Sequence, residues 1–179
     1  MKNLKIIFLI CLTLILTNCK KIVVDTKLQA AQDLVKGDWV ITKISDQYLK
    51  IMENKENYGT KGSVKDLKKE QILGSVYKFP ACDASKVTKV SPCYGTALFA
   101  TKDCGVFYNN DPNTGVLEMS TLVKSAPGIA YSNIELEIIN AFSGMFTIEK
   151  KGADLKIILK ENIYGKTSAV DAYIILSKK

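Results

Sequence analysis

The chain has 179 residues, 47% of them hydrophobic and 24% charged, and this size and composition are typical of a single globular domain. All 25 basic residues are lysines, because the sequence contains neither arginine nor histidine, and the formal net charge is +7. This excludes Ser-His-Asp and Cys-His catalysis, histidine-ligated metal sites and arginine clamps on phosphate. The lysines are scattered among acids without an aromatic-interleaved basic stripe, so we expect no nucleic-acid partner.

The first 18 residues have the features of a secretory signal peptide. Lys2 and Lys5 form a basic start, and residues 6–16 are an almost unbroken apolar run. At about eleven residues this run is too short to span a bilayer, which takes roughly 20. We therefore expect an export signal over residues 1–18, not a resident membrane helix.

The signal ends in Leu16-Thr17-Asn18-Cys19, which resembles the lipobox of bacterial lipoproteins. The resemblance implies that Cys19 becomes the first mature residue and carries acyl chains, which would make the membrane a partner. The alternative is an ordinary secretory signal in which Cys19 is incidental. We expect a lipidated tether over residues 19–26 and a lipid-anchored protein of the cell envelope at the outer membrane, with its face undetermined.

A first helix is expected over residues 27–36. Thr26 and Gln29 have the spacing of a capping box, and Gly37 supplies the stop signal. This helix would open a domain that covers residues 27–179.

A strand at residues 39–44 follows, and residues 46–73 then form a charged insertion. Its C-terminal part is a second helix candidate, with a capping pattern at residues 63–66 and Gly74 at its end.

From residue 75 onward, short runs rich in aromatic and β-branched residues alternate with turn signals. One of them, residues 134–138, alternates apolar residues with Glu135 and Glu137, which is typical of a solvated strand face and not of a catalytic carboxylate pair. The sequence predicts an all-β fold with one or two short helices, in which an up-and-down antiparallel meander of about eight strands closes into a barrel. The expected strands are 76–79, 96–101, 106–108, 116–123, 134–138, 146–148, 155–159 and 172–176.

A helix, then Gly37-Asp38-Trp39 entering the first strand, then a meander that ends at residues 173–179, resembles the lipocalin-like domain found in many small lipoproteins of Gram-negative bacteria. The similarity covers roughly residues 28–179. In lipocalins this Trp plugs the closed end of the barrel under an arginine from late in the fold. The resemblance implies the same place for Trp39, with a lysine such as Lys178 in place of the arginine.

The export signal places the cysteines in an oxidising compartment, where disulfides form. We expect Cys82 and Cys93 to pair across a polar loop between two strands, while a Cys93–Cys104 pair has the same spacing and stays open. Three cysteines without histidine do not make a metal site. The remaining thiol is expected to be buried and inert.

The sequence predicts a protein that is not an enzyme and uses no cofactor or metal. Residues 109–114 are rich in oxygen donors, but Asp111 is their only carboxylate, so we expect an ordinary turn and not a calcium site. Two functions stay open: the barrel binds a small apolar ligand, or it has a filled core and binds an envelope protein or a glycan, with residues 46–73 and 109–114 as contact sites. Six apolar positions would line a cavity or fill a core: Phe79, Phe99, Met119, Leu136, Ile157 and Ile175.

Overall fold

The computed structural model describes residues 25–53, 68–88, 91–99, 102–124, 128, 130–162, 165–166 and 171–179. In chain order, its elements are α2 (Thr26–Val35), β1 (Gly37–Ile44), α3 (Asp46–Glu53), η1 (Lys69–Gln71), β2 (Val76–Phe79), η2 (Ala84–Lys86), β3 (Cys93–Phe99), β4 (Lys102–Asp111), β5 (Val116–Val123), α4 (Asn133–Ala141), β6 (Gly144–Lys151), β7 (Asp154–Asn162), β8 (Gly165–Lys166) and β9 (Tyr173–Lys178).

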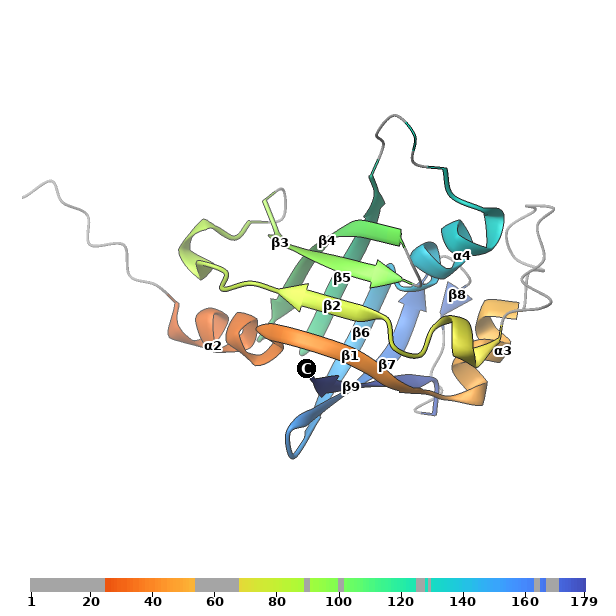
Figure 1. Cartoon of the computed structure of the whole chain (residues 1–179). Helices are drawn as coiled ribbons and strands as arrows, with labels where there is room; N and C mark the ends of the chain where they lie inside the picture. Colours follow the sequence, from red (N-terminus) through yellow and green to blue (C-terminus); the bar gives the residue numbers. More distant parts are fainter. Residues whose placement is uncertain are drawn as a thin grey trace, which may run out of the picture.

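Eight of these strands form a closed antiparallel barrel (Figure 1). The strand order is β6-β5-β4-β3-β2-β1-β9-β7, and pairing of β6 with β7 closes the ring. The two-residue strand β8 pairs with β7 at its end. Each strand thus lies beside its neighbour in sequence, and closure leaves no long unpaired edge. The predicted all-β meander is confirmed, with three α-helices among the described residues.

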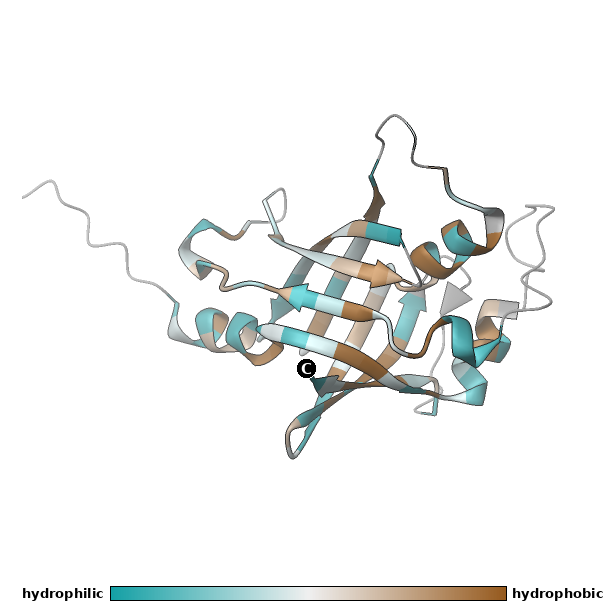
Figure 2. Cartoon of the chain, in the orientation of Figure 1, coloured by the Kyte–Doolittle hydropathy of each residue, from teal (hydrophilic) through white to brown (hydrophobic). Residues whose placement is uncertain are grey.

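The barrel follows from the period-two alternation of its strands, which places every second side chain inside. In β4, Cys104, Val106 and Tyr108 are buried, while Phe107 between them is partly exposed. In β9, Ile174 and Leu176 are fully buried. Figure 2 shows brown, apolar stretches on the strands of the barrel and on α4.

A column of aromatic rings fills the interior. Neighbouring rings along it have centroids between 4.8 and 5.6 Å apart, in stacked or edge-to-face arrangements. At its end, the Tyr108 hydroxyl donates to the carbonyl of Pro80 at 2.9 Å. In order from α3 to the opposite end, the column consists of Tyr48, Phe142, Phe99, Tyr77, Phe79 and Tyr108.

Helices cover both ends of the barrel: α2 lies at one end, and α3 and α4 lie at the other (Figure 1). The hydroxyl of Tyr48 in α3 donates to the carbonyl of Ala141 in α4 at 2.9 Å. At the α2 end, the indole nitrogen of Trp39 donates to the carbonyl of Val35 at 2.6 Å. The Lys178 ammonium lies 4.9 Å from the centroid of the Trp39 ring, so a lysine does cover this Trp.

The predicted strand over residues 134–138 is wrong, because these residues belong to helix α4. Ser132 and Glu135 form a reciprocal capping box, and Ile138, Ile139 and Phe142 pack onto the barrel end. Alternation over five residues indicated a strand, but the capping box at their start and the apolar surface at the barrel end favour a helix.

The N-cap predicted for the first helix is also wrong. Asp25, not Thr26, accepts hydrogen bonds from the first-turn amides, because the helix begins one residue earlier than predicted. The Gln29 side chain is thereby free to bond elsewhere.

The charged insertion contains α3 at its start, which was not predicted. Of the helix expected near residues 63–73, the described part is the single turn η1, and residues 63–67 lie outside the described residues. No helix in the described parts of the chain has the length and apolar character needed to cross a membrane.

Candidate functional site

The residues predicted for export and anchoring cannot be placed. The signal over residues 1–18, Cys19 and residues 20–24 of the tether lie outside the described residues. The described chain begins just ahead of α2, at the end of the barrel that α2 covers.

The Cys82–Cys93 disulfide is confirmed, with a Cα–Cα distance of 5.7 Å. It ties the segment around η2 to the start of β3. Gln29 of α2 supports the same segment, because its amide donates to the Cys82 carbonyl and accepts from the Ala84 N–H, both at 3.0 Å. This segment is therefore held at both its start and its end.

Cys104 is a free cysteine inside the barrel, as predicted for the unpaired thiol. Burial raises the pKa of the thiol to about 11, so it is protonated and a poor nucleophile at neutral pH. It carries no chemistry of its own there.

The six apolar positions expected to face the interior do not all do so. Phe79, Phe99, Met119 and Ile157 are buried inside and belong to one packed core. Ile175 is wrong: its neighbours in β9 point inward, so it lies on the outer face, half-buried. The sixth, Leu136, lies in α4 and not in a strand.

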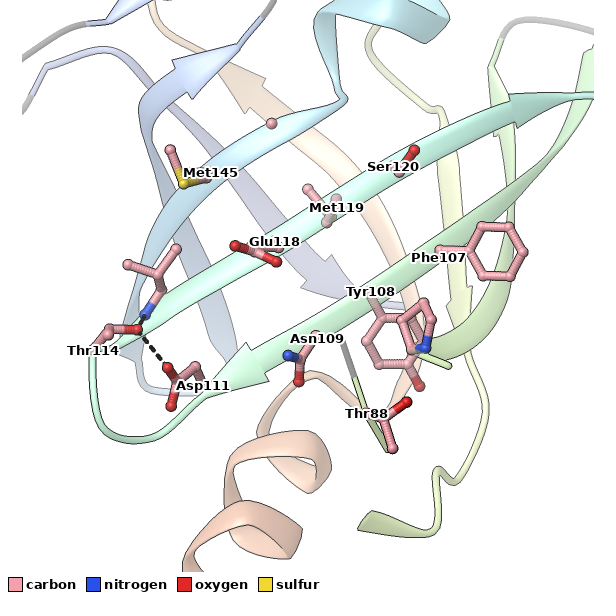
Figure 3. Close-up of a pocket in the computed structure, with 13 residues that line it drawn as sticks. Thr88, Phe107, Tyr108, Asn109, Asp111, Thr114, Glu118, Met119, Ser120 and Met145 are labelled. Carbon is pink, nitrogen blue, oxygen red and sulfur yellow. Dashed lines mark hydrogen bonds between the residues drawn. The ribbon is translucent and has the colours of Figure 1, made fainter. Parts of the chain in front are cut away.

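A groove with a volume of about 720 Å³ lies on the outer face of the barrel, over β4, β5 and β6 (Figure 3). Its floor consists of outward-facing residues of these strands, and Thr88 and Pro92 from the disulfide-closed segment add to its lining. We call this feature the outer groove. The outward residues that line it are Phe107, Asn109, Asp111, Val116, Glu118, Ser120 and Met145.

Strand register arranges the floor of the groove in rows. Phe107 lies opposite Ser120, and Asn109 lies opposite Glu118, which in turn lies opposite Met145 on β6. Directly opposite side chains on one face are neighbours, about 5 Å apart at Cβ. Figure 3 accordingly shows Glu118 in the middle of the groove, between Asn109 and Met145.

Asn109 is oriented by a buried residue beneath it. Gln32 of α2 is 1% exposed, and its amide donates to Asn109 Oδ1 and to the Asn110 carbonyl, both at 3.0 Å. Since the oxygen of Asn109 is taken, its Nδ2 donors face the groove, where no described residue accepts from them (Figure 3). The Glu118 carboxylate opposite likewise has no hydrogen-bond or ion-pair partner among the described residues.

Asp111 contributes a second carboxylate at one end of the groove, but its oxygens accept hydrogen bonds from residues of the following turn. The Asn113 N–H donates to it at 2.9 Å and the Thr114 hydroxyl at 3.0 Å, and these bonds hold its pKa below the usual value. This is turn chemistry. Over the described residues, no group of three or more candidate metal ligands comes together.

An aromatic pair borders the groove. The rings of Tyr94 and Phe107, on neighbouring strands, have centroids 5.3 Å apart, and Tyr94 is 50% exposed. Gly105 makes this possible, because a Cβ there would lie 3.0 Å from the Tyr94 hydroxyl oxygen. The outward side chains of Leu98 and Leu122 extend this apolar surface beyond the groove.

Comparisons with protein-family models, curated proteins and solved structures found no match to this chain. Sequence reasoning had singled out Asn109 and Asp111 within a loop, but it missed Glu118, Phe107 and Met145. The alternation of β5 marks Glu118 as outward-facing. Its neighbours across the sheet depend on register, which the sequence does not state.

Proposed function

We propose that this chain is a lipid-anchored envelope lipoprotein without catalytic activity, whose barrel recognises a partner molecule on its outer surface. The lipobox-like residues at Cys19 support the anchor, and the likeness to lipocalin-like lipoproteins in helix, Gly-x-Trp and meander supports the class. Outer-membrane attachment belongs to the same proposal.

One observation favours recognition outside the barrel over carriage of an apolar ligand inside it: the interior is already occupied. The aromatic column extends from the α3 end of the barrel to the α2 end. Each of its six side chains has an exposed fraction of 2% or less. A ligand inside would have to displace close-packed rings, at a cost of several kcal/mol for each aromatic side chain removed from its packing.

The anchor is tested by metabolic labelling with a radioactive fatty acid, followed by membrane fractionation. Cys19→Ala should abolish labelling. Cys11→Ala is the matched control, because residue 11 leaves with the proposed signal and labelling should persist. Labelling that survives Cys19→Ala would contradict the anchor.

The site of recognition is tested on the full chain in two ways. Native mass spectrometry of the detergent-purified protein should give the mass of the acylated chain alone, whereas an apolar molecule that leaves on denaturation would support the interior-ligand function. A photo-crosslinking residue placed at Tyr94 should form adducts in cells, and the same residue at Glu70, exposed on η1, should not. Equal adducts at both positions would contradict recognition through the outer face.

A further inference from the structure

We infer that the outer groove binds a sugar unit of a glycan that carries no negative charge. This inference rests on the proposed function, because it names the ligand class of the same outer face. The groove volume of about 720 Å³ lies within the range of small-molecule sites and suits a short oligosaccharide.

The central row of the groove presents a hydrogen-bond donor beside an acceptor. Gln32 holds the oxygen of Asn109, so the Nδ2 donors of Asn109 face the groove, and the Glu118 carboxylate on the neighbouring strand accepts. A sugar ring presents adjacent hydroxyls, each of which both donates and accepts. One hydroxyl can donate to Glu118 while its neighbour accepts from Asn109, which satisfies both groups at once.

The ends of the groove fit the rest of such a ligand. Phe107, braced by Tyr94, offers an aromatic face to the apolar C–H surface of a sugar ring. Ser120 lies opposite Phe107 on the floor, and Thr88 adds to the lining from the disulfide-closed segment, so hydroxyl groups are available from both. An apolar ligand would instead bury the unpaired Glu118 carboxylate, at a large desolvation cost.

The charge of the groove restricts the class of glycan further. The groove contains the carboxylates of Glu118 and Asp111, and none of the described residues that line it is a lysine, although the chain as a whole has a charge of +7. Phosphate- or carboxylate-bearing glycans would meet two like charges there. A single cationic side chain would pair with Glu118 but would also face the partly positive amide hydrogens of Asn109.

The test uses the full chain in detergent on an array of neutral, amino-bearing and acidic oligosaccharides together with lysine- and arginine-containing peptides. Titration calorimetry then follows the glycan that binds. We expect binding to uncharged or amino-bearing glycans. Glu118→Gln should weaken it about tenfold, because the charged acceptor of the sugar hydroxyl is replaced by a neutral amide oxygen.

Asn109→Asp is the second variant: it keeps the acceptor that Gln32 needs and removes the donors, so it should weaken binding similarly. The matched control is Glu70→Gln, an exposed glutamate outside the groove, which should bind like the original chain. Thermal melting should show all three variants folded.

Four outcomes would overturn the inference: binding of acidic glycans, glycan binding insensitive to both groove variants, binding of basic peptides alone, or binding of nothing on the array. Binding of basic peptides would still agree with recognition through the outer face. So would the absence of binding on the array together with crosslinks in cells from position 94 and not from position 70. An apolar molecule found in native mass spectrometry would contradict that function itself.

Discussion

The Lys178 ammonium lies 4.9 Å from the centroid of the Trp39 ring, and the indole nitrogen of Trp39 donates to the carbonyl of Val35 at 2.6 Å. One buried ring thus joins the end of β9, the start of β1 and the end of α2. The Lys178 amine also lies close to Gly37, where a Cβ would come within 3.1 Å of it and where φ is +133°. These contacts of Trp39 close the α2 end of the barrel.

We expect Lys178→Ala to lower the free energy of unfolding by about 0.5–1 kcal/mol, because the cation–π contact is lost, and Lys178→Arg to retain it. Urea unfolding followed through the fluorescence of Trp39, the single tryptophan of the chain, measures this. Lys179→Ala removes a neighbouring lysine as the control. Equal effects of the two alanine variants would show that the ring contact contributes nothing.

Tyr77 and Tyr48 give opposite predictions for the same chemical change. The Tyr77 hydroxyl is buried without a partner among the described residues, so Tyr77→Phe should raise the free energy of unfolding by about 1 kcal/mol. Tyr48→Phe loses the bond to the Ala141 carbonyl and should lower it by about the same amount. Urea unfolding measures both, and a loss of stability in Tyr77→Phe would mean that its hydroxyl is satisfied in solution.

Cys104 should make the fold sensitive to alkali. Burial raises the pKa of its thiol from 9.0 to about 11, so the unfolded chain releases this proton at a lower pH than the folded chain. The unfolded state therefore binds fewer protons between pH 9 and 11, and stability falls as pH rises through that window. Cys104→Ala should show a smaller fall over the same window.

The same thiol should stay unmodified by a disulfide reagent at pH 8 and react once the chain is unfolded in guanidinium. Rapid reaction of the folded protein at pH 8 would contradict the burial of Cys104.

The Cys82–Cys93 disulfide should contribute to both stability and the outer groove. Replacing both cysteines by serine should lower the free energy of unfolding by about 3 kcal/mol, because the unfolded chain loses a short cross-linked loop. Glycan affinity in the groove should fall as well, since Thr88 and Pro92 lie inside that loop. Reduction of the original chain with dithiothreitol should lower both the free energy of unfolding and the glycan affinity in the same way. The reduced Cys104→Ala variant should show losses of the same size, because Cys104 is not part of the disulfide.

The alternation of buried and exposed residues along the strands made the barrel predictable. Most strands pair with their neighbours in sequence, so closing the meander into a barrel requires only a few further pairings. Period-two patterning is a property of each strand alone, so it can be read without tertiary contacts. The error at residues 134–138 shows the limit of this signal. Five alternating residues fit a strand, yet the Ser132–Glu135 capping box and the contacts of Phe142 with Tyr48 and Phe99 make them a helix.

The candidate site was much less predictable. Asn109, Glu118 and Met145 lie on three successive strands, and each taken alone is an ordinary surface residue. They meet because β4, β5 and β6 pair in one particular register, and a shift of a single residue would turn Glu118 inward.

By itself, the sequence determined the class of fold, because the hydrophobic period of a strand is a local property of the chain. The structure then decided that Cys93 pairs with Cys82 and not with Cys104, since the two possible loops have the same spacing. Only the tertiary structure decided what fills the barrel and where a ligand can bind. Rings from α3, from the C-terminal end of α4 and from the three strands β2, β3 and β4 meet in one column, and a buried glutamine in α2 orients an asparagine on the outside of β4. Such juxtapositions depend on packing between distant segments, and no local pattern encodes them.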